Sequence, residues 1–214
     1  MGLLLLMLLS FASCKDKDES APMPVNQTST DTIADPDTTQ MPDTVFFKYL
    51  ALGDSYTIGT ALPDSSRNYP NQLVERLNED SLLDGSEPDI IAFGGWRTDQ
   101  LISAIEAADL AGEYELVSLL IGVNNQFQNR SDSVYAIEFE ELLNTAIDFA
   151  GDDTNRVFVL SIPDYGVTPF GQSYPNATSG VDAFNAINLQ ITNNYGISYF
   201  NITEISRQAE NNLT

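Results

Sequence analysis

The sequence predicts an α/β protein, a three-layer α/β/α sandwich built around a five-stranded parallel sheet. Short, almost continuously apolar segments alternate along the chain with segments in which apolar residues recur at helical spacing. Strands that are apolar on both faces are typical of parallel sheets covered by helices on both sides. Apolar residues make up 43% of the 214 residues, which is enough for the core of one ordinary domain.

The expected strands and helices alternate in order along the chain. The apolar segments expected as strands are 45–52, 90–93, 115–121, 156–162 and 197–202. Helical spacing predicts helices at 69–80, 101–108, 131–150 and 181–194, with Pro70 in a first turn, Ser131 as an N-cap and Thr203 as the cap of a further helix. Right-handed crossovers in such a flavodoxin-like sheet place every strand's carboxyl end at one edge, where ligands bind.

The N-terminal segment is expected to be a targeting signal followed by a tether, rather than part of the folded domain. Leu3 to Phe11 is an apolar run too short to span a membrane, and it is typical of the core of a secretory signal. The run ends in Phe11-Ala12-Ser13-Cys14, which resembles a bacterial lipobox. Residues 1–14 are therefore expected to be a lipoprotein signal peptide with lipidation at Cys14. The alternative is an incidental thiol near a cleavage site.

Residues 15–44 are rich in Thr, Asp and Pro and hold few aliphatic side chains. They cannot bury enough apolar surface to offset the entropy lost on ordering, so we expect a disordered acidic tether. The folded domain is assigned to residues 45–214. This organisation predicts a lipid-anchored monomer of the bacterial cell envelope, at the outer membrane and facing the periplasm or the surface.

Composition excludes several classes of function. The chain has 9 Lys and Arg against 31 Asp and Glu, for a net charge of −22, which disfavours binding to nucleic acid or to anionic membrane surfaces. Membrane contact is expected only through the lipid anchor. The single cysteine excludes an internal disulfide and a cysteine-based zinc site. No histidine is present, so these residues alone cannot complete a Ser-His-Asp triad. No metal or cofactor is expected.

Three of the expected strand ends carry small or polar residues, in Gly53-Asp54-Ser55, Gly94-Gly95 and Gly122-Val123-Asn124. A serine on the tight turn after the first strand would expose its hydroxyl at the ligand-binding edge, with its own N–H at a helix start. A glycine after the second strand allows close approach to a backbone N–H. An asparagine after the third supplies a side-chain N–H. Together they predict a nucleophile, Ser55, and an oxyanion hole made by Ser55, Gly95 and Asn124.

These segments resemble the conserved blocks of the SGNH (GDSL) hydrolases. The run 49–59 (YLALGDSYTIG) is similar to the first block, Gly95 matches the glycine of the second, and Gly122 and Asn124 match the third. The resemblance spans about residues 46–205. It implies that Ser55 is the nucleophile of a serine esterase or acyl hydrolase, acting on a small-molecule or glycan ester. Carbohydrate O-acyl esters and lipid esters both remain open as substrates.

Two departures from the family pattern stand out. Asn125 occupies the position after Asn124 where the family usually has Asp. The fourth block, an aspartate and a histidine near the C-terminus, is missing, so we expect the sequence to be truncated before it. No other base is expected to serve Ser55: Lys48 lies roughly 23 Å away along the strand, and Asp54 points the other way from the same backbone. The chain as given is therefore predicted to be nearly inactive.

Each candidate residue also has a purely structural interpretation. Ser55 could be a turn residue or helix cap, Gly95 a strand terminator whose role Gly94 could take, and Asn124 a turn residue. Three further residues could line the cleft or simply form turns and packing: Trp96, Asp164 and Tyr165. Two rival functions remain: a non-catalytic surface lipoprotein that uses the fold as a binding module, and a phosphate- or flavin-binding module. The second is disfavoured by the negative charge and by the lack of a glycine-rich phosphate loop.

Overall fold

The computed structural model describes residues 43–110 and 112–208. The expectations for the signal peptide, for Cys14 and for nearly all of the tether lie outside these residues. Within the described part, no helix is both long and apolar enough to cross a membrane.

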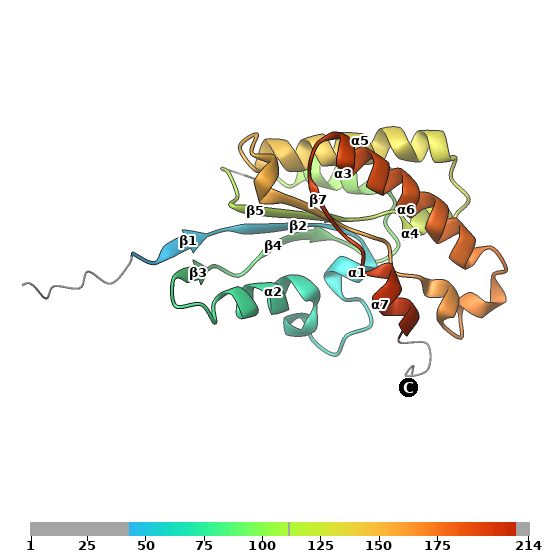
Figure 1. Ribbon diagram of the computed structural model, residues 1–214, viewed down its shortest axis with the longest axis horizontal. Helices are drawn as coiled ribbons and strands as arrows, with labels where there is room; N and C mark the ends of the chain where they lie inside the picture. The colour runs from blue at the N-terminus through green and yellow to red at the C-terminus, as the bar shows by residue number, and fades with distance from the viewer. Residues whose placement is uncertain (1–42, 111, 209–214) are drawn as a thin grey trace, which may run out of the picture. The chain divides into compact units, whose positions relative to one another are not determined.

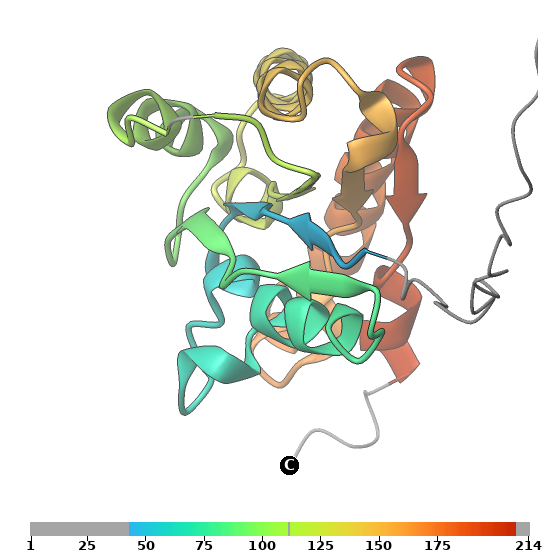
Figure 2. The same ribbon diagram turned by 90° about the vertical axis from the view of Figure 1, so that its left-hand side faces the viewer.

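A five-stranded parallel sheet forms the centre of the domain (Figures 1 and 2). Its spatial order is β4-β2-β5-β6-β7, so the first of these strands in the chain lies between the second and the third. This is the doubly wound, flavodoxin-like order. The predicted fold class is confirmed. The strands are β2 (Tyr49–Gly53), β4 (Asp89–Ala92), β5 (Leu116–Leu120), β6 (Val157–Leu160) and β7 (Ser198–Phe200).

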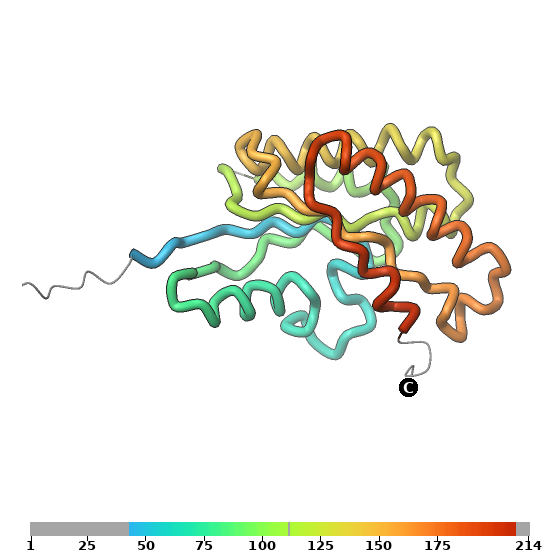
Figure 3. The backbone as a smooth tube through the Cα atoms, viewed as in Figure 1, coloured from blue at the N-terminus to red at the C-terminus, as the bar shows by residue number. Residues whose placement is uncertain are grey.

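Helices cover both faces of the sheet, and Figure 3 follows the chain as it passes between them. On one face lie α3 (Thr98–Ala107), α5 (Asp132–Phe149) and α6 (Ala177–Asn194). On the other lie α2 (Tyr69–Leu77) and α7 (Thr203–Gln208). Two short helices, α1 (Ser55–Ile58) and α4 (Val123–Phe127), follow β2 and β5 directly. Short 3₁₀ turns complete the described elements: Ser65–Arg67, Thr154–Arg156, Tyr165–Val167 and Gly171–Ser173.

The central strand β2 is buried along its whole length and divides the core into two clusters. Alternation along a strand sends successive side chains to opposite faces. Leu50 and Leu52 accordingly pack in the larger cluster with α3, α5 and α6. Tyr49 and Ala51 pack on the other face with Val74 of α2. Burial on both faces explains why this segment appears in the sequence as a continuous apolar run.

The first predicted strand is in fact two strands, which is a correction to the sequence analysis. β1 (Val45–Phe47) leaves the main sheet and pairs in parallel with β3 (Leu83–Gly85), forming a separate two-stranded sheet. The break falls at Lys48, whose N–H donates to the Glu115 carboxylate over 2.8 Å. The Lys48 carbonyl accepts from two successive N–H groups, those of Glu115 and Leu116. Two donors facing one acceptor interrupt the regular ladder, as in a β-bulge.

An apolar groove of about 560 Å³ lies between α2 and the sheet, over β6 and β7. Phe200 of β7 is 54% exposed there. The helices described on this face therefore cover these strands less completely than α5 and α6 cover the opposite face. The residues that line the groove are Tyr69, Leu73, Leu77, Leu116, Phe158, Leu160, Phe200 and Ile202.

Candidate active site

Ser55 lies at the tight turn between β2 and α1 and is the first residue of α1. The turn depends on Gly53, because a Cβ there would collide with the Thr57 side chain and the Leu120 carbonyl. The missing side chain lets α1 fold back directly against β2 and β5. Within the described residues, neither the Ser55 hydroxyl nor its backbone N–H has a hydrogen-bond partner. Both groups are therefore available at the start of a helix.

Asp54 caps α1 from inside the protein. Its carboxylate accepts from the Tyr56 N–H over 3.0 Å, and the residue is only 1% exposed. Burial raises the pKa of Asp54 to about 7, and the hydrogen bond from Tyr56 offsets part of that rise. Asp54 lines neither of the cavities at Ser55. The Asp54 side chain is therefore buried behind the turn that carries Ser55 and does not face either cavity.

Ser55 opens onto two cavities, which bring it together with the other two predicted residues. The first, about 290 Å³, is lined by Ser55, Asn124 and several aromatic rings, and we call it the serine cavity. The second, about 580 Å³, is lined by Ser55 and both Gly94 and Gly95, and we call it the glycine cavity. The predicted nucleophile and both predicted donors thus meet at one edge of the sheet.

Asn124 reaches the serine cavity from the first turn of α4. The helix begins at Gly122, whose φ of +127° favours glycine and whose Cβ position is blocked by the Tyr135 hydroxyl. One N–H of the Asn124 amide donates to the Trp96 carbonyl over 2.9 Å. This bond fixes the amide plane and leaves a second N–H for a ligand.

Gly95 follows β4 and has a φ of +88°, in the left-handed region where glycine is favoured. Its N–H has no acceptor within the described part of the chain. The neighbouring Gly94 lines the same cavity but lies against the Thr60 side chain. A Cβ at Gly95 would meet no other atom within 4 Å, so Gly95 has more free space around its backbone than Gly94.

Asn125, the residue that departs from the family pattern, is fully buried between two of the site loops. Its Oδ1 accepts from the Thr98 N–H over 3.1 Å, and its Nδ2 donates to Thr98 Oγ1 over 2.6 Å. The Thr98 hydroxyl in turn donates to Glu138. An ionised aspartate at this position could not donate to the hydroxyl oxygen while the hydroxyl proton serves Glu138, whereas the amide can. The neutral residue thus links the Asn124 loop to the loop that carries Gly95.

The sequence did not decide whether Trp96, Asp164 and Tyr165 line the cleft, and the structure gives each a different role. Tyr165 lines the serine cavity, and its hydroxyl donates to Gln126 Oε1 over 2.9 Å. Asp164 is buried and caps the following 3₁₀ turn through the Gly166 N–H, so it is a turn former. Trp96 packs on Phe93, with ring centroids 5.6 Å apart, and lines neither cavity.

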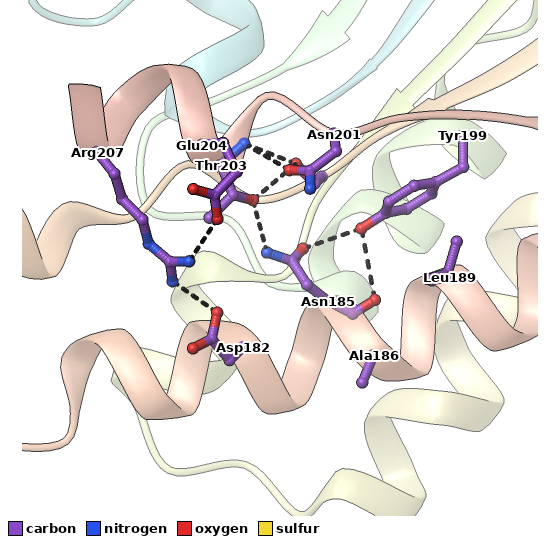
Figure 4. A pocket seen from close by; sticks show the side chains of 10 residues that line it. Asp182, Asn185, Ala186, Leu189, Tyr199, Asn201, Thr203, Glu204 and Arg207 are labelled. Carbon is purple, nitrogen blue, oxygen red and sulfur yellow. Dashed lines mark hydrogen bonds and ion pairs between the residues drawn. The ribbon is translucent and has the colours of Figure 1, made fainter. Parts of the chain in front are cut away.

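Arg207 of α7 forms an ion-pair cluster that includes the buried Asp164, and Figure 4 shows its contacts with Asp182 and Glu204. Arg207 Nε donates to the buried Asp164 carboxylate over 2.9 Å, and its other nitrogens donate to Asp182 and Glu204 over 2.6 and 2.8 Å. The hydrogen bonds that Arg207 donates to Asp182 and Asp164 are the main causes that raise the pKa of Arg207 above its usual value. No local pattern in the sequence indicates this cluster, because its partners lie up to 43 residues apart.

Three exposed rings beside the serine cavity were also missed by the sequence analysis. They are Phe127 of α4, together with Phe170 and Tyr174 from the segment after β6. The sequence signal was weak, since an isolated aromatic residue in a loop has no periodicity. Among the described residues, no group of His, Cys, Asp and Glu could hold a metal ion.

The fold and the site together define a doubly wound α/β protein with an available serine at the ligand-binding edge. A family model described as the GDSL-like Lipase/Acylhydrolase family matches residues 51–214, and the chain belongs to this family. Membership places it among the hydrolases that act on ester bonds.

Solved structures show the same fold at low sequence identity. An acetyl xylan esterase, AlAXEase, is 12% identical with a TM-score of 0.60, covering 77% of this chain and 82% of that one. The SGNH-hydrolase family esterase AlinE4 is 15% identical with a TM-score of 0.56, covering 78% and 81%. A lipase/acylhydrolase from Enterococcus faecalis is 19% identical with a TM-score of 0.54, covering 74% and 77%. No curated protein matches the chain.

Proposed function

We propose that the protein is a serine esterase that hydrolyses carbohydrate O-acyl or lipid esters with Ser55 as its nucleophile. The observation that carries the proposal is the meeting of Ser55 with Asn124 in one cavity and with Gly95 in the other. The N–H groups of Ser55 and Gly95 and the free amide N–H of Asn124 are the proposed oxyanion hole. Donors already aimed at a developing negative charge need no reorganisation during the reaction.

In the proposed reaction, Ser55 Oγ attacks the acyl carbon and its proton passes to a general base. The carbonyl oxygen becomes an oxyanion, the alcohol leaves with the proton, and water then hydrolyses the acyl-enzyme. The 214 residues contain no histidine. We propose that the base is the histidine of an Asp-x-x-His block encoded beyond Thr214. Without it, the oxyanion hole and binding would leave at most about 10³–10⁴-fold acceleration over water.

The absence of histidine also supports a second candidate, a surface lipoprotein that binds ligands without hydrolysing them. The sequence of the gene after the Thr214 codon separates the two. An Asp-x-x-His block there supports the esterase, and a stop codon directly after Thr214 in independent clones supports the binding protein.

Labelling by a fluorophosphonate tests the nucleophile directly. We expect the gene product to be labelled at Ser55, because an activated serine attacks phosphorus as it attacks an acyl carbon. Ser55→Ala should abolish labelling, whereas Ser133→Ala, at an exposed serine of α5, should leave it unchanged. Equal labelling of the wild type and Ser55→Ala would exclude Ser55 as the nucleophile.

Anchoring through Cys14 is a further part of the proposal and rests on the sequence alone. Cys14 is the only cysteine and directly follows the apolar run. Metabolic labelling with palmitate is expected for the wild type and should be lost in Cys14→Ala. Label that persists in this variant would rule out lipidation at that residue.

A further inference from the structure

We propose that the rings beside Ser55 bind the sugar part of the substrate, and that the ester hydrolysed is carried by an uncharged glycan. This inference rests on the proposed esterase function and narrows its substrate class. The rings form one contiguous aromatic wall, consisting of Phe127, Tyr165, Phe170 and Tyr174.

The aromatic wall is both compact and accessible. The ring centroids of Phe127, Phe170 and Tyr174 lie 5.0 to 5.9 Å from one another. These three side chains are 38%, 59% and 41% exposed, so they are not core residues. The rings are tilted against one another by 37° to 69°, so together they offer a contiguous apolar surface on which the C–H groups of a pyranose ring can pack.

The wall connects the nucleophile to a second cavity. The serine cavity holds Ser55, and a neighbouring cavity of about 190 Å³ is lined by Asn129 and Asn176, with Gln126 at its side; we call it the amide cavity. Phe127 and Tyr165 line both. A ligand that lies along the wall can therefore place one end at Ser55 and the other among the amides.

The amide cavity supplies hydrogen-bond donors that the protein itself does not use. The Tyr165 hydroxyl donates to Gln126 Oε1, so this hydrogen bond does not use the amide N–H groups of Gln126. Asn176 is the N-cap of α6, yet its side chain makes no capping bond. Within the described residues, the side-chain N–H groups of Gln126, Asn129 and Asn176 have no acceptor. Sugar hydroxyl groups both accept and donate hydrogen bonds and match such amides.

Charge decides between the possible substrate classes. None of the residues that line the serine or amide cavities is charged, although the chain carries 31 acidic and 9 basic side chains. An anionic lipid headgroup or uronic acid would find no cation there to replace its lost hydration. A fatty acyl chain would cover the amides without giving them acceptors, which costs free energy for each buried donor. A neutral sugar can pack its C–H groups on the rings and accept hydrogen bonds from the amides through its hydroxyl oxygens.

Binding measurements test this inference independently of catalysis. Isothermal titration is carried out on the gene product with Ser55→Ala, which lacks the nucleophile and so leaves the probe intact, and acetylated xylotetraose, a neutral probe, is expected to give a millimolar or tighter dissociation constant. Tetragalacturonate, an anionic probe of similar size, should bind at least about 10-fold more weakly. Phe170→Ala should weaken binding of the neutral probe by about 10-fold or more. Phe46→Ala removes an equally exposed ring on β1, outside both cavities, and should leave binding unchanged.

The outcomes separate this inference from the proposed function. Fluorophosphonate labelling of Ser55 with no binding of the neutral probe would overturn the glycan assignment alone. Tighter binding of dioctanoylglycerol in uncharged micelles, weakened by Phe170→Ala, would also overturn it and assign the wall to a lipid. Neutral-probe binding that depends on Phe170, without labelling of Ser55, would support the assignment of the aromatic wall to a sugar and overturn the proposed esterase function, leaving a glycan-binding module.

Discussion

Hydrolysis of a soluble acetate ester by the gene product should fall about 10⁶-fold in Ser55→Ala and about 10²–10³-fold in Asn124→Ala. Ser55 would form the covalent intermediate, so its removal would abolish the acyl-enzyme route. Asn124 would instead stabilise the oxyanion, and the two backbone donors remain when its amide is removed. Asn124 and Ser55 line the same cavity, and the bond to the Trp96 carbonyl already sets the amide plane.

Steady-state kinetics with p-nitrophenyl acetate check this prediction. An oxyanion donor acts in the transition state, so Asn124→Ala should lower kcat while leaving KM nearly unchanged. Asn193→Ala, at an exposed asparagine of α6, is the matched control and should retain full activity. A rise in KM with unchanged kcat would show that Asn124 binds the ground state and contributes nothing specific to the transition state.

Asp54→Asn should stabilise the folded protein by about 4 kcal/mol at pH 8 and by little near pH 4. Burial raises the pKa of Asp54 from 3.8 to about 7. The folded state therefore holds the proton more tightly than the unfolded state. The stability contributed by this group is fully present below about pH 4, falls as the pH rises, and is lost above about pH 7. Asparagine is neutral throughout and keeps the acceptor for the Tyr56 N–H.

Urea unfolding at pH 4, 6 and 8 measures the difference in free energy of unfolding between the variant and the wild type. That difference should grow by about 1.4 kcal/mol per pH unit across the window. Asp64→Asn is the matched control, since Asp64 caps a 3₁₀ turn through the Ser66 N–H but is exposed. Because this side chain is exposed, its replacement should change the free energy of unfolding far less than Asp54→Asn does at pH 8. A difference for Asp54→Asn that stays constant with pH would mean that Asp54 ionises freely in the folded state.

The sheet could be predicted because its central strands, β2 and β5, are buried on both faces and so appear as separate apolar runs. The ends of most elements were placed within a few residues. The split at Lys48 could not be predicted, since 45–52 is apolar on both sides of the lysine. The break depends on Glu115, which lies 67 residues away and binds the Lys48 N–H.

The positions of the candidate site residues followed from topology. Parallel strands end at one edge, so Ser55, Gly95 and Asn124 had to lie near one another whatever the loops did. The aromatic wall and the ion pairs of Arg207 did not follow from topology. They depend on how irregular segments fold back on the sheet, and the pair formed by Arg207 and Asp164 joins two such segments across 43 residues.

The uncharged lining of the serine and amide cavities affects how a substrate arrives as well as how it is held. A net charge of −22 surrounds the molecule with a negative potential that reaches about 8 Å from the surface at physiological ionic strength. A neutral ester diffuses through that potential without being steered, so its rate of capture does not depend on salt. Anionic esters are slowed before they make any contact. Under the proposed function, the acidic surface would disfavour anionic esters at the encounter, and the aromatic wall would favour glycan esters after it.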